Sequence, residues 1–134
     1  MGSSPAGGIP DRRERLPRGS RIRRGTEIRS LLRKGARARS AHLNVFAAPA
    51  PGSVPRFGTI VPRYGRNAVA RNLLRRRLRE VGRREILPEL ARRGCAVDFL
   101  VRARANAYAA RFPELEAELL RLSEGLCPDG SFLR

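Results

Sequence analysis

PRYGRNAVARNLLRRRLREVGRR, residues 62–84, is the stretch that decides the fold of this chain. If residues 68–84 form a helix, its apolar side chains recur at steps of four, four and three and make a stripe that can pack on a core. The stripe consists of Ala70, Leu74, Leu78 and Val81. The opposite side of the helix carries Asn72, Arg75, Arg76, Arg79 and Arg83. We therefore predict a helix that is anchored by one face and presents guanidinium groups on the other.

The arginines of this stretch predict a ligand rich in phosphate. Nine arginines stand there against a single acid, Glu80. A guanidinium offers a planar fork of donors that matches phosphate oxygens. The alternative is a solvated basic face, but such faces usually mix charges of both signs to limit repulsion. The residues we assign to nucleic-acid binding are Arg63, Arg66, Arg71, Asn72, Arg75, Arg76, Arg79 and Arg83.

The charge of the whole chain points the same way. Its 134 residues carry a formal net charge of +17, and 28 of the 29 basic residues are arginines. Residues 1–84 carry a net charge of +18, whereas residues 85–134 carry −1. Such a charge raises encounter rates with polyanions and makes binding steeply salt-dependent. The length suits one domain with a modest core.

The order of the remaining elements predicts an α+β fold, a two-layer α/β sandwich with one small sheet. Residues 1–20 are predicted to be a disordered basic arm, 21–124 the folded binding domain and 125–134 a flexible tail. The expected elements are a helix capped at Thr26 that ends at Gly35, strands over 37–47 and 56–61, a helix capped at Asn67, a strand over 95–101 and a helix from Pro113. The order is thus helix, strand, strand, helix, strand, helix.

Two of the strands carry further information. Residues 95–101, CAVDFLV, are almost continuously apolar, which predicts a central strand with Asp98 at an edge or paired with an arginine. Alternation within 37–47 predicts one buried and one open face. Leu43 and Val45 point one way, and His42, Asn44 and Phe46 point the other. Phe46 and Tyr64 could stack on unpaired bases; Tyr64, between two arginines, is the better candidate, because Phe46 fits a place in the core at least as well.

No catalytic or metal site is predicted in this chain. His42 is the only histidine, and Cys95 and Cys127 lie far apart, whereas metal sites need clustered ligands. No nucleophile motif and no glycine-rich phosphate loop is present. The start of the chain lacks the apolar core of a secretory signal, and no stretch reaches the length of a membrane span. We therefore expect a cytoplasmic protein without a membrane partner.

Residues 58–80, GTIVPRYGRNAVARNLLRRRLRE, resemble the signature of the bacterial ribonuclease P protein subunit, whose helix reads roughly A-V-x-R-N-R-x-K-R-x-x-R-E. The positions that match are Ala68, Val69, Arg71, Asn72, Arg76, Arg79 and Glu80, and Arg75 replaces the usual Lys. The flanks agree as well. Residues 21–35 are similar to the family's first helix, and residues 98–104 to its strand of the form D-x-x-x-x-A-R.

The chain also departs from that family at a few positions. Leu73 stands where the family has the Arg that directly follows Arg-Asn, which removes one expected RNA contact. Tyr64 takes the place of a Lys before the helix, and Gly65 falls one residue early. Ile28 and Leu32 stand where the family carries aromatic residues that help to line the groove for the 5′ leader of precursor tRNA.

The resemblance implies a fold and a role. The fold is of the ribosomal S5 domain 2-like type, with a left-handed βαβ crossover around the basic helix. The role is that of the protein subunit of ribonuclease P, an endoribonuclease whose RNA subunit catalyses removal of the 5′ leader with bound Mg²⁺. The implied partners are this RNA and the leader, in a one-to-one complex with a monomeric protein that itself binds no cofactor. For the leader we assign His42, Asn44, Phe46 and Tyr64.

Two other classes of protein could also explain the basic helix. A ribosomal-type or other structured-RNA or DNA-binding protein could use the same helix without a role in catalysis. A helix that reads a DNA groove, however, typically belongs to a helix-turn-helix or a dimer, and strands flank this one on both sides. A cationic module for membranes or acidic proteins would pair its arginines with large exposed apolar residues, whereas the apolar stripe here is needed for the core.

Overall fold

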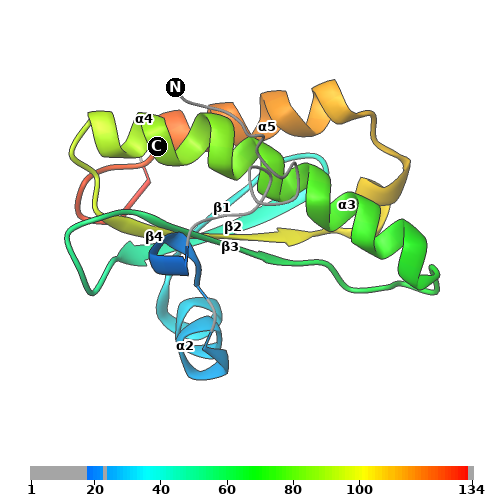
Figure 1. Cartoon of the computed structure of the whole chain (residues 1–134), viewed down its shortest axis with the longest axis horizontal. Coiled ribbons are helices and arrows are strands. Elements are labelled where there is room, and N and C mark those ends of the chain that lie inside the picture. The colour runs from blue at the N-terminus through cyan, green and yellow to red at the C-terminus, as the bar shows by residue number, and fades with distance from the viewer. Residues whose placement is uncertain (1–17, 23, 133–134) are drawn as a thin grey trace, which may run out of the picture.

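The computed structural model describes residues 18–22 and 24–132, which form one four-stranded sheet with helices on both faces (Figure 1). The elements are η1 (Arg18–Ser20), α2 (Gly25–Lys34), β1 (Ala36–Arg39), β2 (Leu43–Pro49), β3 (Arg56–Ile60), α3 (Ala68–Val81), η2 (Gly82–Ile86), α4 (Leu87–Arg92), β4 (Val97–Ala103), η3 (Ala105–Ala109) and α5 (Phe112–Glu124). The strand order is β1-β2-β4-β3. Helix α2 lies on one face, and α3, α4 and α5 lie on the other (Figure 1). The predicted α+β class is confirmed.

The prediction of one strand over residues 37–47 was wrong, because this segment is a hairpin. Strands β1 and β2 pair antiparallel, and the amide of Ser40 donates to the carbonyl oxygen of Leu43 across the turn (2.8 Å). Arg37 and Arg39 share a face with Phe46, whereas Leu43 and Val45 face the main core. A single strand would have placed these four odd-numbered residues on one side. The chain turns so that both arginines stay exposed and both apolar side chains are buried.

Strand β4 occupies the centre of the sheet, as its apolar run predicted. It pairs antiparallel with β2 and parallel with β3. The parallel pair is joined by the crossover through α3, η2 and α4. Asp98 of β4 is buried and accepts two hydrogen bonds from Arg56 of β3, each 2.8 Å. The predicted pairing of Asp98 with an arginine is therefore confirmed, and the ion pair ties the two parallel strands together.

Helix α3 packs on the sheet through the predicted stripe. Leu74, Leu78 and Val81 are buried in the main core, while Ala70 is half-buried at its border. The helix does not fade at Gly82 but passes into a π-helical turn, in which the amide of Leu87 donates to the Gly82 carbonyl. A Cβ atom at Gly82 would lie 2.6 Å from ring atoms of Phe57. Glycine fits here because it has no Cβ atom; its backbone lies in the ordinary helical region, so the close approach of helix and sheet, not the backbone conformation, favours it.

Helix α2 forms a smaller second core on the opposite face. Leu31 is buried against Ile22, Phe46 and Leu100. The predicted cap at Thr26 was wrong, since the N-cap position is Arg24 and makes no side-chain cap bond. The predicted end at Gly35 is confirmed by the hydrogen bond from its amide to the Leu31 carbonyl (2.9 Å).

The structure describes little of the predicted N-terminal arm but most of the predicted C-terminal tail. The basic arm 1–20 lies outside the described residues except for the single turn η1. Residues 125–132 are not a loose end: Leu126 is buried in the main core, pairs with Phe132 through a β-bridge, and Phe132 itself packs against that core. The predicted boundary at residue 124 therefore falls inside the folded unit.

Candidate nucleic-acid interface

The outer face of α3 carries the predicted row of arginines. The helix begins at the predicted cap, where the amide of Ala70 donates to the Asn67 side chain (2.9 Å). Asn72, Arg76 and Arg79 are exposed, and Arg75 is half-buried beside them. Among the described residues, no carboxylate forms an ion pair with Arg75, Arg76 or Arg79. These three guanidinium groups thus lie on the surface with their charge uncompensated.

Two other predicted residues have structural partners. The Nε of Arg71 donates to the carbonyl oxygen of Val61 (2.7 Å) and so ties the first turn of α3 to the end of β3. Arg83 donates to Glu80 (2.9 Å), which also receives a hydrogen bond from Arg84 (3.4 Å). Arg71 is therefore a positioning residue that leaves part of its guanidinium for a ligand, and Arg83 is the member of the predicted set whose charge is compensated.

The electrostatics of α3 indicate a strong local positive field. Partial burial lowers the pKa of Arg75, and the neighbouring charge of Arg71 lowers it further. Burial likewise lowers the pKa of Arg79, with further contributions from Arg75 and Arg21. Like charges that are held close together without acids raise the free energy of the unliganded protein, and a polyanion relieves that cost.

The connection between β3 and α3 is a tight turn at the end of the sheet. Tyr64 and Gly65 both have positive φ angles, 49° and 81°. Gly65 adopts this left-handed conformation freely, but Tyr64 is held there at a cost, which is typical of functional turns. The Tyr64 hydroxyl donates to the Ala103 carbonyl (3.3 Å), and the residue is 48% exposed. Tyr64 therefore stands at the end of β4 with a face open to solvent.

Arg66 in the same turn packs on an aromatic ring. Its guanidinium carbon lies 5.0 Å from the ring centre of Tyr108, whose hydroxyl donates to the carbonyl of Pro62 (2.7 Å). Arg63 is exposed next to it. The turn thus brings both predicted arginines next to the start of α3, where they extend its basic face.

The α2 side of the sheet holds a polar row that sequence reasoning found only in part. The register places Arg39, Asn44, Arg102 and Ile60 side by side across all four strands. Arg39 and Arg102 are exposed, and the buried side-chain oxygen of Asn44 has no hydrogen-bond partner among the described residues. The row borders an open hollow of about 350 Å³ beside Arg37 and Phe46. The alternating arginines of the ARAR segment are the signal that could have revealed Arg37 and Arg39.

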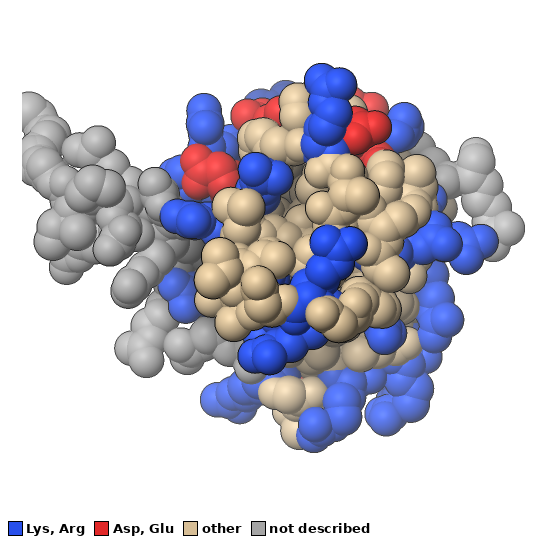
Figure 2. All heavy atoms as spheres, turned by 90° about the vertical axis from the view of Figure 1, so that its right-hand side faces the viewer, with Lys and Arg blue, Asp and Glu red and all other residues tan. Residues whose placement is uncertain are grey.

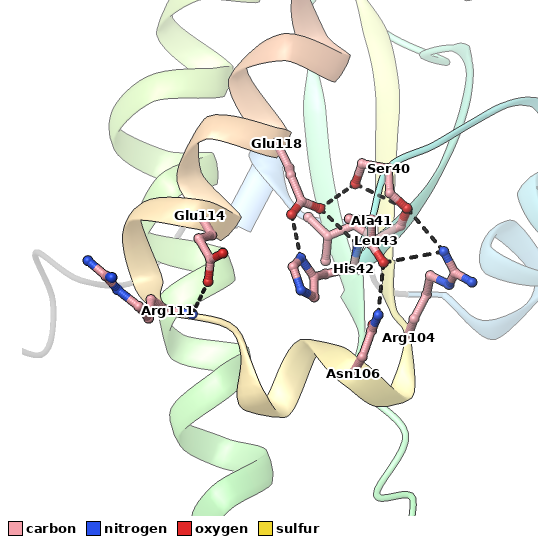
Figure 3. Close-up of polar contacts among 9 residues, drawn as sticks. All are labelled: Ser40, Ala41, His42, Leu43, Arg104, Asn106, Arg111, Glu114 and Glu118. Atoms are coloured by element: carbon pink, nitrogen blue, oxygen red, sulfur yellow. Dashed lines mark hydrogen bonds and ion pairs between the residues drawn. The ribbon is translucent and has the colours of Figure 1, made fainter.

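Two residues predicted for the open sheet face are not exposed on it. Phe46 is on that face but only 7% exposed, because α2 covers it and the guanidinium of Arg37 lies 5.5 Å from its ring centre. His42 points to the opposite side, where its ring contacts the buried carboxylate of Glu118 in α5 (Figure 3). The expectation that His42, Asn44 and Phe46 share an exposed face was therefore wrong. It failed because His42 belongs to the hairpin turn rather than to the strand.

The contact between His42 and Glu118 is part of a polar cluster that fixes the hairpin turn. Glu118 also accepts hydrogen bonds from the Ser40 hydroxyl and from the His42 amide, the latter 3.0 Å long (Figure 3). Arg104 and Asn106 donate to the carbonyl oxygens of the turn. Burial works to raise the pKa of Glu118, but the hydrogen bonds from Ser40 and His42 together outweigh it, so that the pKa lies below its usual range.

Charge is unevenly distributed on the face of the molecule that Figure 2 shows. In Figure 2, acidic side chains gather in the upper part of the view, whereas basic side chains dominate the lower part and the flanks.

Within residues 18–22 and 24–132 there is no group of three or more Cys, His, Asp or Glu side chains that could hold a metal ion. None of the helices in this part of the chain combines the length and the apolar character needed to cross a bilayer.

Comparison with known proteins then decides the family. A model of the family described as Ribonuclease P matches residues 16–126. The ribonuclease P protein component of Acidothermus cellulolyticus is 36% identical over 113 residues, which cover 80% of this chain and 88% of that protein. The chain belongs to the ribonuclease P protein family. The ribonuclease P protein component of Desulfovibrio desulfuricans is 37% identical over 115 residues. The match covers 83% of this chain and 85% of that protein.

Solved structures of the ribonuclease P family share the fold. The ribonuclease P protein of Staphylococcus aureus superposes with a TM-score of 0.65 at 23% identity, over 78% of this chain and 93% of that one. The Thermotoga maritima protein gives a TM-score of 0.64 at 23% identity, over 78% and 94% of the two chains. The predicted resemblance is thus confirmed, and with it the function as a protein subunit of ribonuclease P. The individual site residues stay predictions.

Proposed function

We propose that α3 binds the RNA subunit of ribonuclease P and that the open α2 side of the sheet holds the 5′ leader of precursor tRNA. The observation that carries the proposal is the row of uncompensated guanidinium groups on α3, anchored from below by Leu74, Leu78 and Val81. A rigid helix with its charges uncompensated before binding pays little entropy to contact a phosphate chain. Arg75, Arg76, Arg79 and Asn72 are the primary contacts, with Arg63, Arg66 and part of Arg71 beside them.

In this proposal the active site belongs to the RNA subunit. Mg²⁺ bound to that RNA would supply the Lewis-acid chemistry for phosphodiester hydrolysis. No residue of this chain is assigned to the metal or to the reacting atoms. The protein acts as one monomer per RNA, in the cytoplasm. Its chemical contribution is to lower the repulsion between two polyanions that must approach closely, the RNA subunit and the precursor.

The leader is assigned to a different part of the surface from the RNA subunit. The row of Arg39, Asn44 and Arg102 offers two charges for phosphates and an amide that can pair with the edge of a base. Tyr64, at the end of β4, can stack on a base. Phe46 supports this surface from below, and His42 holds the hairpin turn in place from the opposite face.

Reconstitution tests the proposed function. The chain is added to a bacterial ribonuclease P RNA at a low Mg²⁺ concentration, and removal of the leader from precursor tRNA is followed with time. We expect the protein to restore cleavage that the RNA alone performs poorly under these conditions. RNA binding without any gain in cleavage would instead identify a structured-RNA-binding protein without a role in catalysis.

The leader surface needs its own measurement. Affinity of the reconstituted complex is compared for precursor tRNA and for mature tRNA, which lacks the leader. The substitutions Arg39→Ala and Arg102→Ala should each reduce the preference for the precursor and leave binding of mature tRNA unchanged. Arg121→Ala, an exposed arginine on α5, is the matched control. Equal losses for both tRNAs would remove the sheet face from leader recognition.

A further inference from the structure

An exposed apolar pair lies on the outer face of α3. Val69 is 77% exposed and Leu73 39%, and no other helix in the described part of the chain carries a large apolar side chain this open to solvent. Residues four apart on a helix are neighbours, so the two side chains form one patch. The buried stripe of α3 faces the opposite side, and the patch is therefore not needed to hold the helix on the core. Leu73 also stands where the ribonuclease P family has an arginine, so this chain carries an apolar group in place of a charge.

A small hollow with an aromatic wall continues this patch. Its volume is about 200 Å³, and it is lined by Arg76, Arg77, Glu80 and Phe112. Arg76 and Arg77 follow Leu73 by three and four residues, which places the hollow one turn further along the same side of α3. Phe112, the first residue of α5, packs against the main core but is only half-buried. Single apolar side chains scattered over a surface are normal, whereas an apolar pair that adjoins an aromatic hollow marks an interaction site.

The charges around the hollow favour an anionic partner. The carboxylate of Glu80 is already engaged, because Arg83 and Arg84 both donate to it. Among the described residues, no carboxylate forms an ion pair with Arg76 or Arg77. Arg77 lies outside the set of arginines assigned above and is half-buried at the border of the outer face. The partner must therefore combine an apolar surface with negative charge.

A nucleotide with an unpaired base has this combination, and a second protein molecule does not. The face of a base is flat and stacks on aromatic groups, and phosphates lie on either side of it along the strand. A stable contact between two proteins buries about 800 Å² on each partner, far more than two side chains and part of one ring provide. A second copy of this chain would also bring two sets of uncompensated arginines together. Within a duplex a base is stacked on both sides, so only an unpaired base can offer its face.

We propose that Val69, Leu73 and Phe112 receive one unpaired base of the RNA subunit, with Arg76 and Arg77 on the adjoining phosphates. The inference rests on the proposed function and deepens it, because it states which kind of RNA structure α3 binds. The helix meets a bulge, a loop or a single strand rather than the backbone of a continuous duplex. Leu73 then replaces the RNA contact expected of an arginine by an apolar contact with a base.

Salt separates the base contact from the phosphate contacts. A phosphate contact weakens with salt because it releases counterions, whereas an apolar contact releases none. Loss of the base contact should therefore lower the affinity by the same factor at every salt concentration. If the base covers about 40 Å² of Leu73, that factor is about five.

The first experiment measures binding of a labelled ribonuclease P RNA to the whole chain by fluorescence anisotropy over a salt series. Leu73→Gln removes the apolar surface, keeps the net charge and has nearly the same helix propensity. We expect about fivefold weaker binding with an unchanged slope of log K against log salt. Leu73→Met, which stays apolar, should bind as the unchanged chain does. The matched control is Val54→Gln in the loop between β2 and β3, which is 53% exposed and lies outside both proposed RNA surfaces.

The same series contains the results that would overturn the proposal. One is a folded Leu73→Gln protein that binds the RNA as tightly as the unchanged chain. Another is a loss of affinity with a flatter slope, because the variant would then act through phosphate contacts. Urea denaturation checks the fold, and sedimentation of the free chain tests the second copy as the occupant. A dimer that Leu73→Gln dissociates would assign the patch to protein and not to RNA.

The second experiment changes the RNA. Ribonuclease P RNAs are prepared with one abasic nucleotide at a time at unpaired positions, which removes a base and keeps its phosphates. One such position should weaken binding to the unchanged chain about fivefold and should not weaken binding to Leu73→Gln any further, because both changes delete the same contact. If every abasic RNA loses the same affinity for the two proteins, no base lies on Leu73.

The two proposals fail in distinguishable ways. If reconstituted cleavage is stimulated but Leu73→Gln binds the RNA normally, only the base contact is lost. If Leu73 and one base depend on each other but cleavage is not stimulated, the base contact stands and the proposed function is lost.

Discussion

Removal of two surface charges from α3 gives the sharpest test of its role. The double variant Arg75→Ala and Arg76→Ala deletes two adjacent guanidinium groups that have no ion pair with the described residues. Alanine is at least as favourable as arginine in a helix, and the deletion also relieves repulsion between like charges, so the fold should be kept. The variant therefore changes the binding surface without a cost in stability.

The expected magnitude follows from the number of phosphates that lose a partner. Each neutralised phosphate contributes about 0.7–0.9 to the slope of log K against log salt. Two lost contacts should thus flatten the slope by roughly 1.4–1.8. Extrapolated from 1 M to physiological salt, this corresponds to roughly 20-fold weaker binding, and the difference should vanish as salt approaches about 1 M.

The assay is fluorescence anisotropy with a labelled ribonuclease P RNA over a series of salt concentrations. The matched control is the double variant Arg92→Ala and Arg121→Ala, which removes the same net charge from α4 and α5. Arg92 makes an exposed ion pair with Glu89, and such pairs contribute little to stability. If the control flattens the slope as much as the α3 variant, net charge rather than this helix binds the RNA. An unchanged slope for the α3 variant would refute the assignment directly.

Three further predictions concern the fold that holds the interface. Gly82→Ala should lower the unfolding free energy by about 1–3 kcal/mol in urea denaturation, because the added methyl group meets the Phe57 ring, although helix propensity alone predicts a gain. The pKa of Glu118 is lower in the folded protein than its ordinary value. The contacts of its carboxylate therefore stabilise the fold fully above the ordinary pKa of a glutamate, and this stabilisation is lost as the pH falls through the lowered pKa. Glu118→Gln, which still reaches His42, should therefore flatten stability against pH between about pH 5 and pH 2, and an equally steep acid loss would contradict this. Asn67→Ala should lower the unfolding free energy by about 1 kcal/mol in the same assay, because α3 loses its cap. An unchanged unfolding free energy would contradict the role of this cap.

Much of the fold could be predicted because local patterns agreed with the tertiary packing. The steps of four, four and three placed Leu74, Leu78 and Val81 in the core, and the cap at Asn67 lies where α3 begins. Residues 97–101 of the apolar run lie in β4, next to the centre of the sheet as expected, whereas Cys95 and Ala96 precede the strand. In each case the signal is contained within a few neighbouring residues, so that no distant contact was needed to interpret it.

Only one part of the candidate site could be predicted from the sequence. The arginines on α3 follow from helical spacing alone, since the buried stripe leaves them only the outer face. The proposed leader surface did not follow, because it combines residues of β1, β2 and β4, whose order and register bring Arg39 and Arg102 beside Asn44. His42 illustrates the limit: it lies in the turn between β1 and β2 rather than in a strand, and its side chain therefore reaches Glu118 on the other face of the sheet.

The sequence by itself thus determined that this chain forms a basic helix with one buried face and that it belongs among the ribonuclease P proteins. Helical periodicity and charge are local properties, and they survive any arrangement of the other elements. The tertiary structure alone decided that Gly82 must be glycine and that Glu118 is buried against the hairpin turn. It also decided that Arg77 and Phe112 line the same hollow. These are contacts between residues far apart in the chain, and only the packing of helices on the sheet brings them together.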